Sequence, residues 1–432
     1  MAGKELFMLG ADNYCYFTAL LRKELIPATG CTEPIAIAFT AACAREILGR
    51  EPQKITVRCS GNVIKNVKGV TIPGTDGLKG IDKSAVLGSI VGCSGAGLQV
   101  LSKVTSEQLH RMDKLLAQGI CDVELLEDVA DLDILVEMTA QDQSALVEVA
   151  GGHTNVVRSE KNGVAITLQT AARPKGEAAH DRETALDLHG IFDYAATVDV
   201  GEVQDLLDRQ IQYNSAIARE GIANCYGCGI GACLIKNRGD DVRTRAKALA
   251  AAGSDARMGG CPMPVIINSG SGNQGLTVCL PVVVYAQELG ADDERLYRAL
   301  ILANLVAIQL KSGIGCLSAF CGAVSAACGA GAAITWLRGG NFEEISSAIS
   351  NALATSAGIM CDGAKPSCAA KIAVAVDTAL LASDLALQGR DFQAGDGLVG
   401  ADIEETAMNM MRLGRVGMRK TDKEILHMML RH

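Results

Sequence analysis

The stretch of sequence that decides the fold is residues 361–387, CDGAKPSCAAKIAVAVDTALLASDLAL. Its Asp-Gly and Lys-Pro dipeptides favour turns, and the apolar run that follows predicts a buried helix. Ser367 can cap that helix, which places Cys368 at a helix N-terminus, where the helix dipole favours a thiolate. Thiolates bind metals, so Cys361 and Cys368 are candidate ligands, although their six-residue gap matches none of the common zinc or ferredoxin spacings.

The same alanine- and glycine-rich character extends upstream over residues 316–337, which carry no charge. This run is long enough to span a bilayer, but ten of its twenty-two residues are Ala or Gly and six are large and apolar. We therefore expect a buried helix of a soluble protein.

The composition predicts a large, closely packed core. Apolar residues make up 49% of the 432 residues, aromatic residues make up 3%, and there are 47 glycines. The net charge is −9 and no Lys/Arg cluster occurs, so we expect neither a nucleic-acid partner nor a membrane partner. Lys4, Glu5 and Asp12 interrupt the N-terminus, which argues against a secretory signal. Sixteen cysteines in a cytoplasmic protein indicate metal binding or catalysis rather than disulfides.

A further candidate thiol lies near the N-terminus. Residues 12–26 predict a helix, the chain breaks at 27–30, and Cys31 precedes an apolar run that Thr32 or Glu33 can cap. The position before a helix favours a Cys31 thiolate. A small residue in a tight loop is the alternative, and the local sequence does not decide between them.

The fold class that these patterns predict is mainly α with an inserted α+β domain. Alternating or β-branched runs predict strands at 54–59, 123–126, 134–138, 145–149, 155–157 and 164–167, with helices at 86–101 and 106–117. A polar stretch at 173–183 follows. Helical patterns then recur at 200–207, 207–221, 242–252, 276–289, 294–310, 316–337, 342–360, 368–387 and 402–413. We therefore assign residues 1–50 plus 185–432 to a helical catalytic domain rich in Ala and Gly, and residues 52–184 to the inserted α+β domain.

A glycine-rich loop, NSGSGNQG, occupies residues 268–275. It contains the G-x-G-x-x-G pattern of dinucleotide sites, but no repeating βαβ pattern surrounds it. An anion site is the better interpretation, because backbone N–H groups at a helix N-terminus can hold a small carboxylate. Ser269, Ser271, Asn273 and Gln274 would add side-chain hydrogen bonds. A plain interhelical loop is the alternative.

Other polar residues give weaker signals. Cys225 and Cys228 form a C-x-x-C with Cys233 nearby, but no second pair completes a zinc site, so we expect buried or substrate-adjacent cysteines. His153 lies among glycines, where another surface can approach closely. We expect the inserted domain to cover the site, with Asn62 and His153 near the cleft.

Three motifs together resemble the L-cysteine desulfidase family, which is similar to the alpha chain of the iron–sulfur L-serine dehydratases. The motifs are TGCTEP at 29–34, SGSGNQG at 269–275 and CDGAKPSC at 361–368, and the resemblance extends over nearly the whole chain. It implies an oxygen-sensitive lyase that releases sulfide, ammonia and pyruvate from L-cysteine. It also implies a 4Fe–4S cluster held by three cysteines, with one open iron.

Carried over position by position, the resemblance implies cluster ligands at Cys321, Cys361 and Cys368, with Cys316 and Cys328 as competitors for the first. The implied base is Cys31. An open iron is a Lewis acid that can bind the substrate sulfur.

The remaining expectations concern the substrate and its partners. The substrate carboxylate is expected on the 269–275 loop, with Thr32 and Glu33 also in the substrate site. L-serine or another β-hydroxy amino acid is the alternative substrate, and a non-enzymatic iron–sulfur or zinc sensor is an alternative of another class. The expected partner is a small amino acid, bound by a single chain or by a homodimer.

Overall fold

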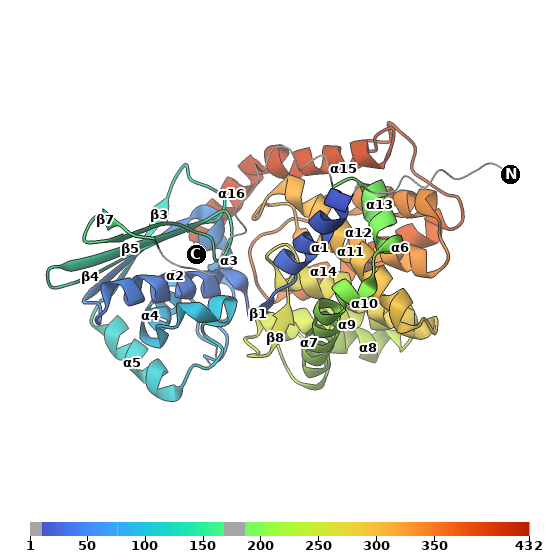
Figure 1. The fold of residues 1–432 in the computed structure, drawn as a ribbon. Coiled ribbons are helices and arrows are strands. Elements are labelled where there is room, and N and C mark those ends of the chain that lie inside the picture. The colour runs from blue at the N-terminus through green and yellow to red at the C-terminus, as the bar shows by residue number, and fades with distance from the viewer. Residues whose placement is uncertain (1–10, 76, 168–185, 432) are drawn as a thin grey trace.

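The computed structural model describes residues 11–75, 77–167 and 186–431 (Figure 1). The residues used to argue against a signal, Lys4 and Glu5, and the polar stretch at 173–183 lie outside the described residues. The described chain forms a mixed sheet with helices on one face, beside a larger helical unit, which confirms the predicted fold class.

The sheet contains strands in the order β3-β2-β4-β5-β6-β7. Strands β2 and β3 are parallel, and the other neighbouring strands are antiparallel. The bounds are β2 Lys54–Ser60, β3 Cys121–Leu126, β4 Asp133–Ala140, β5 Gln143–Ala150, β6 Val156–Lys161 and β7 Val164–Ala165. Alternate residues of β2, β4 and β5 are buried, as the period of two predicts for a sheet with one covered face.

The helices on this sheet include one that the sequence assigned to the other unit. Helix α2 (Thr32–Leu48) packs against β4, β5 and α4 (Ile81–Val91), together with the 3₁₀ turn η1 (Ser94–Gln99). Almost every α2 side chain is buried, so the helix needs apolar neighbours on several sides and the sheet supplies one of them. Residues 32–48 thus lie in the α+β unit, which also contains α3 (Gly61–Lys68) and α5 (Ser106–Ala117).

The helical unit is organised around α12 (Gly322–Leu337), which packs against α10, α11, α13 and α14. Small residues permit this close packing: a Cβ on Gly329 would lie 2.3 Å from the Ala303 carbonyl oxygen of α11. The other helices are α1 Ala11–Glu24, α6 Leu188–Thr197, α7 Gln204–Ala223, α8 Ile230–Arg238, α9 Val242–Met258, α10 Gly272–Glu288, α11 Asp293–Ile314, α13 Phe342–Ser356, α14 Ser367–Ala386 and α15 Ile403–Arg412.

The apolar run at 316–337 is not one continuous helix. Its first residues form a loop after α11, and the helix begins at Gly322. Within the described residues, no helix combines the length and the apolar character that crossing a membrane requires. Two short strands, β1 (Pro27–Thr29) and β8 (Pro264–Ile266), pair beside the junction of the two units.

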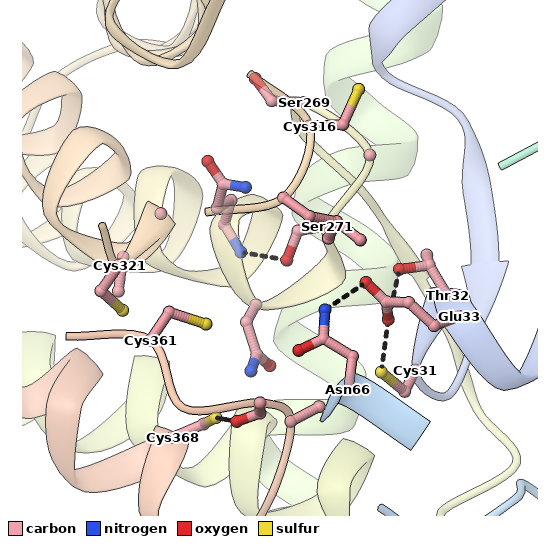
Figure 2. Close-up of a pocket in the computed structure, with 18 of the residues that line it drawn as sticks. Cys31, Thr32, Glu33, Asn66, Ser269, Ser271, Cys316, Cys321, Cys361 and Cys368 are labelled. Atoms are coloured by element: carbon pink, nitrogen blue, oxygen red, sulfur yellow. Dashed lines mark hydrogen bonds between the residues drawn. The ribbon is translucent and has the colours of Figure 1, made fainter. Parts of the chain in front are cut away.

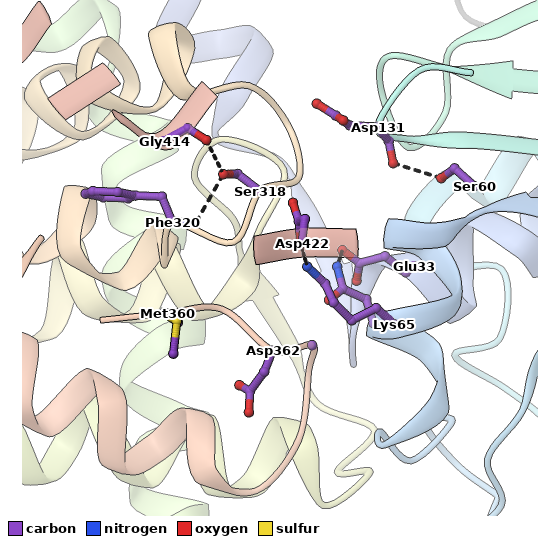
Figure 3. A network of polar contacts seen from close by, with 12 residues as sticks. Glu33, Ser60, Lys65, Asp131, Ser318, Phe320, Met360, Asp362, Gly414 and Asp422 are labelled. Atoms are coloured by element: carbon purple, nitrogen blue, oxygen red, sulfur yellow. Dashed lines mark hydrogen bonds and ion pairs between the residues drawn. The ribbon is translucent and has the colours of Figure 1, made fainter. Parts of the chain in front are cut away.

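A C-terminal arm links the two units. It consists of α15, the π turn η4 (Leu413–Gly417) and α16 (Arg419–Leu430), which reaches from the helical unit to α3 (Figure 1). Asp422 of α16 forms an ion pair with Lys65 of α3, whose side chain is 1% exposed (Figure 3). At the other end of the arm, Ser318 donates a hydrogen bond to the Gly414 carbonyl at 2.8 Å. The sequence did not predict α16.

Candidate functional site

One cavity lies where the two units meet, and it collects residues from widely separated parts of the chain (Figure 2). The α+β unit contributes the start of α2, Asn66 of α3 and His153. The helical unit contributes the end of α9, the glycine-rich loop, the end of α11 with the loop after it, and the segment 361–368. Eleven of the residues that the sequence proposed for the site line this cavity: Cys31, Thr32, Glu33, His153, Ser269, Ser271, Asn273, Gln274, Cys321, Cys361 and Cys368.

The three cysteines proposed as metal ligands line the same cavity. Cys321 is the N-cap of α12, and Cys368 is the second residue of α14. The long gap between Cys321 and Cys361 is closed by backbone pairing: Cys321 N–H donates to the Ile359 carbonyl at 3.2 Å, and Cys361 N–H donates to the Ala319 carbonyl at 2.6 Å. Spacing along the sequence could not reveal this pairing.

The electrostatics of these cysteines differ from the expectation at Cys368. Burial raises the pKa of the Cys368 thiol, so its position at a helix N-terminus does not by itself produce a thiolate. Burial and the neighbouring Cys361 raise the pKa of Cys321 to about 12. Both positions therefore favour neutral thiols until a cation is close enough to stabilise the thiolates.

Cys31, and not Thr32 or Glu33 as expected, is the N-cap residue of α2, and its side chain makes no capping hydrogen bond. Its side chain donates to Glu33 Oε2 at 2.9 Å. Burial raises the pKa of the Cys31 thiol well above its usual value, and the adjacent Glu33 carboxylate raises it further. The expectation that the helix dipole alone favours a Cys31 thiolate is wrong, because burial outweighs it.

Glu33 is the hydrogen-bonding centre of the site (Figure 2). It accepts from Thr32 Oγ1 at 3.3 Å and from Asn66 Nδ2 at 3.1 Å, and His153 Nε2 lies 3.6 Å from its Oε1 atom. Burial alone would raise its pKa, but the contacts with His153 and Cys31 lower the pKa of Glu33 to about 2. Glu33 is thus a buried carboxylate that stays ionised.

The α+β unit supplies a different asparagine from the one expected. Asn62 is absent from the residues that line the cavity, whereas Asn66, one turn later on α3, lines it. The buried Asn66 Oδ1 and His153 Nε2 atoms have no hydrogen-bond partner among the described residues. Asn66 was not predicted because no helix was expected between the strand at 54–59 and the helix at 86–101, whereas α3 occupies Gly61–Lys68.

The glycine-rich loop leads into α10 as a capped helix start. Ser271 is the N-cap and accepts from Gln274 N–H, while Ser269 and Gly270 have positive φ angles of 49° and 74°. A Cβ on Gly270 would lie 3.0 Å from the His153 ring, so this glycine lets the two units approach closely. The buried Gln274 Oε1 has no partner among the described residues.

Two buried cations, Arg257 and Lys311, line the cavity, and neither was predicted from the sequence. Arg257 donates to the Gly30 carbonyl and to Asn273 Oδ1, and so joins the α2 entry to the glycine-rich loop. Lys311 lies in the last turn of α11. Lys311 is an isolated charge at the end of an apolar run, which is the signal that could have identified it, whereas Arg257 follows Asp255 closely and carries no such signal.

Other cysteines lie elsewhere. Cys225, Cys228 and Cys233 are exposed and do not line the cavity, so the expectation of buried or substrate-adjacent thiols is wrong for them. Cys328 is buried within α12, whereas Cys316 lines the cavity and donates to the Gly151 carbonyl at 3.2 Å. In the described part of the chain, no three His, Cys, Asp or Glu side chains are gathered tightly enough to hold a single metal ion.

Comparisons with known proteins agree with the motif resemblance. A family model described as the serine dehydratase alpha chain matches residues 95–427. A UPF0597 protein of Lachnoclostridium phytofermentans is 50% identical over 411 residues, covering 95% of this chain and 98% of the relative. A UPF0597 protein of Desulfitobacterium hafniense is 48% identical over 426 residues, covering 98% and 99%. These matches support an enzyme of the lyase type, and the chain belongs to the serine dehydratase alpha chain family.

Proposed function

We propose that the protein is an iron–sulfur-dependent β-elimination lyase that converts L-cysteine to pyruvate, ammonia and sulfide. The observation that carries the proposal is a shared cavity: Cys321, Cys361 and Cys368 line it together with Cys31, Glu33 and the glycine-rich loop. The thiol ligands for iron and the polar groups that can bind an amino acid therefore lie in one site.

The donor set fits a 4Fe–4S cluster with one open iron. Cys321, Cys361 and Cys368 are free thiols, and each would bind a different iron, so their sulfur atoms need not converge on one point. When bound, such a cluster would supply a Lewis-acidic iron for the substrate sulfur.

The residues around the cluster site would bind the amino acid. Glu33 is suited to the substrate ammonium because it is ionised, buried and already surrounded by hydrogen-bond donors. The start of α10 is suited to the carboxylate, because the first N–H groups of a helix have no partner within the helix.

Cys31 is the proposed base. In the elimination it takes the proton from Cα, the remaining electron pair forms the Cα–Cβ double bond, and the Cβ–S bond breaks to release sulfide. The aminoacrylate then tautomerises to an imine, and one water hydrolyses the imine to pyruvate and ammonia. Burial and Glu33 raise the pKa of the Cys31 thiol, so the thiolate that acts as the base needs a positive charge nearby, and Arg257 supplies one. Glu33 stays ionised and orients the Cys31 side chain through Oε2.

L-serine is the second candidate substrate. The observation that favours it is the matching family model, which is described as the serine dehydratase alpha chain. The two reactions differ in one leaving-group atom.

The test is to purify the protein without oxygen, reconstitute iron and sulfide, and measure pyruvate and sulfide from L-cysteine and L-serine. Formation of pyruvate and sulfide from L-cysteine supports the proposal. Faster formation of pyruvate from L-serine would make L-serine the substrate in place of L-cysteine. Bound iron with no pyruvate from either amino acid contradicts the lyase proposal and favours a sensor.

A further inference from the structure

Lys311 is a buried lysine without a partner. Its residue is 6% exposed, and it lines the cavity from the last turn of α11. Among the residues that the structure describes, no carboxylate lies within 4.0 Å of its ammonium and no group accepts a hydrogen bond from it. Burying an ammonium without a partner is unfavourable, so such a group indicates a ligand that completes it.

The other lysines and arginines near the site are already engaged. Arg257 donates to Gly30 and Asn273, Lys65 pairs with Asp422, and Lys371 of α14 pairs with Asp362. Lys371 is an informative comparison, because it also lies near Cys321 and Cys368 but outside the cavity lining.

Burial lowers the pKa of Lys311, and the groups whose charge would oppose this shift come from several elements. Cys316, Cys321 and Cys361 lie on the loops that border the cavity, and Asp131 lies in the connection between β3 and β4. Asp131 is outside ion-pair distance (Figure 3 shows it bound through its backbone carbonyl to Ser60). The C-terminal end of α11 further favours a positive charge at this position.

We propose that Lys311 binds the carboxylate of the amino-acid substrate and so determines that the site takes a zwitterion. This inference rests on the proposed function. A free amino acid carries one negative and one positive group, and the cavity offers one unpaired ammonium, at Lys311, and one ionised carboxylate, at Glu33. Lys311 would then neutralise the carboxylate whose oxygens the α10 N-terminus also contacts.

The alternative is that Lys311 balances the charge of the cysteine ligands. Two non-reacting probes separate these roles: L-alanine, which lacks a leaving group at Cβ, and L-alaninamide, which also lacks the carboxylate. Binding of each is measured by calorimetry on reconstituted protein, and iron content is measured for every variant.

The expected result is that the wild-type protein binds L-alanine about 10- to 100-fold more tightly than L-alaninamide, the effect of one charged hydrogen bond. Lys311→Met should remove most of this preference, leaving only the share that the α10 N–H groups supply, with L-alaninamide binding and iron content unchanged. Lys311→Arg, which retains the charge, should keep more of the preference than Lys311→Met. The control Lys371→Met should keep all of it.

Equal binding of the two probes by the wild-type protein would overturn the inference, whether or not Lys311→Met folds. So would a Lys311→Met protein that retains the full preference, or one that loses iron and binds both probes equally weakly. This test separates failure of the carboxylate site from failure of the proposed lyase activity. A protein that makes no pyruvate but shows the Lys311-dependent preference refutes the lyase and supports this carboxylate site.

Discussion

Among single residues, the cysteines that line the cavity have two proposed roles, as cluster ligands and as the base. Cys321→Ala, Cys361→Ala and Cys368→Ala should each lower the iron content after reconstitution, because each removes one proposed ligand. Cys31→Ala should retain iron and lose pyruvate formation by about 100-fold or more, the usual contribution of a positioned acid or base. Iron assays and steady-state kinetics on the same preparations measure both effects.

Cys93→Ala is the matched control, because Cys93 is exposed and does not line the cavity. It should keep both iron and activity. Full activity in Cys31→Ala would remove Cys31 as the base, and undiminished iron in Cys361→Ala would remove Cys361 as a ligand.

Glu33 should leave a signature in the pH dependence of stability. Its pKa falls from 4.5 to about 2 on folding, so the unfolded chain binds this proton first as the pH decreases. The contribution of the ionised carboxylate is therefore present above about pH 4.5 and is lost progressively towards pH 2, and it amounts to roughly 3 kcal/mol. Urea unfolding from neutral to acidic pH should show the wild-type protein losing stability relative to Glu33→Gln. A difference between the two proteins that does not vary with pH would contradict the assignment.

At the scale of elements, the glycine-rich loop shows why its motif resembles a dinucleotide fingerprint without needing that function. Gly270 has a positive φ angle, a Cβ on Gly272 would lie 2.5 Å from the Arg257 guanidinium, and a Cβ on Gly275 would lie 2.0 Å from the Ile266 carbonyl oxygen. The glycines thus permit a turn, an arginine contact and close packing of α10 on β8.

Gly275→Ala should therefore destabilise the protein by about 1–3 kcal/mol, because the added methyl group must displace backbone. Thermal or urea unfolding measures the loss. Gly358→Ala is the control, since Gly358 is exposed and a Cβ there would meet nothing within 4 Å. Equal stabilities for the two variants would show that α10 can move away from β8.

Local patterns predicted the elements better than the contacts between them. The helix at 106–117 follows from its apolar period, and the strands β2 to β6 follow from their alternating or β-branched runs. The site depends on non-local packing: Glu33 meets Asn66 and His153 through the approach of three elements, which no short motif encodes. Helix α16 escaped prediction because none of its residues is fully buried and its apolar residues are confined to its second half, from Ile425 to Leu430, which is too short a run to predict a helix.

At the scale of the whole molecule, the C-terminal arm contacts both walls of the cavity. On one side, Gly414 of the arm accepts a hydrogen bond from Ser318, which lies in the loop that leads to Cys321. On the other side α16 holds α3, which carries Asn66 to Glu33, and the side chain of Leu426 fills the space beside Gly61. The arm therefore couples the position of α3 to that of the cysteine loops.

The Lys65–Asp422 ion pair is the contact in the arm whose loss should cost most (Figure 3). Asp422→Ala should destabilise the protein by about 3 kcal/mol or more, because it leaves the buried Lys65 ammonium without a counter-charge. Glu424→Ala, on the exposed side of the same helix, should change the unfolding free energy by no more than about 0.5 kcal/mol. Replacing both partners, in Lys65→Met with Asp422→Leu, should recover most of the stability, since no buried charge remains. Urea unfolding of the four proteins tests this, and a double variant as unstable as Asp422→Ala would show that the helix contact, not the unpaired charge, sets the cost.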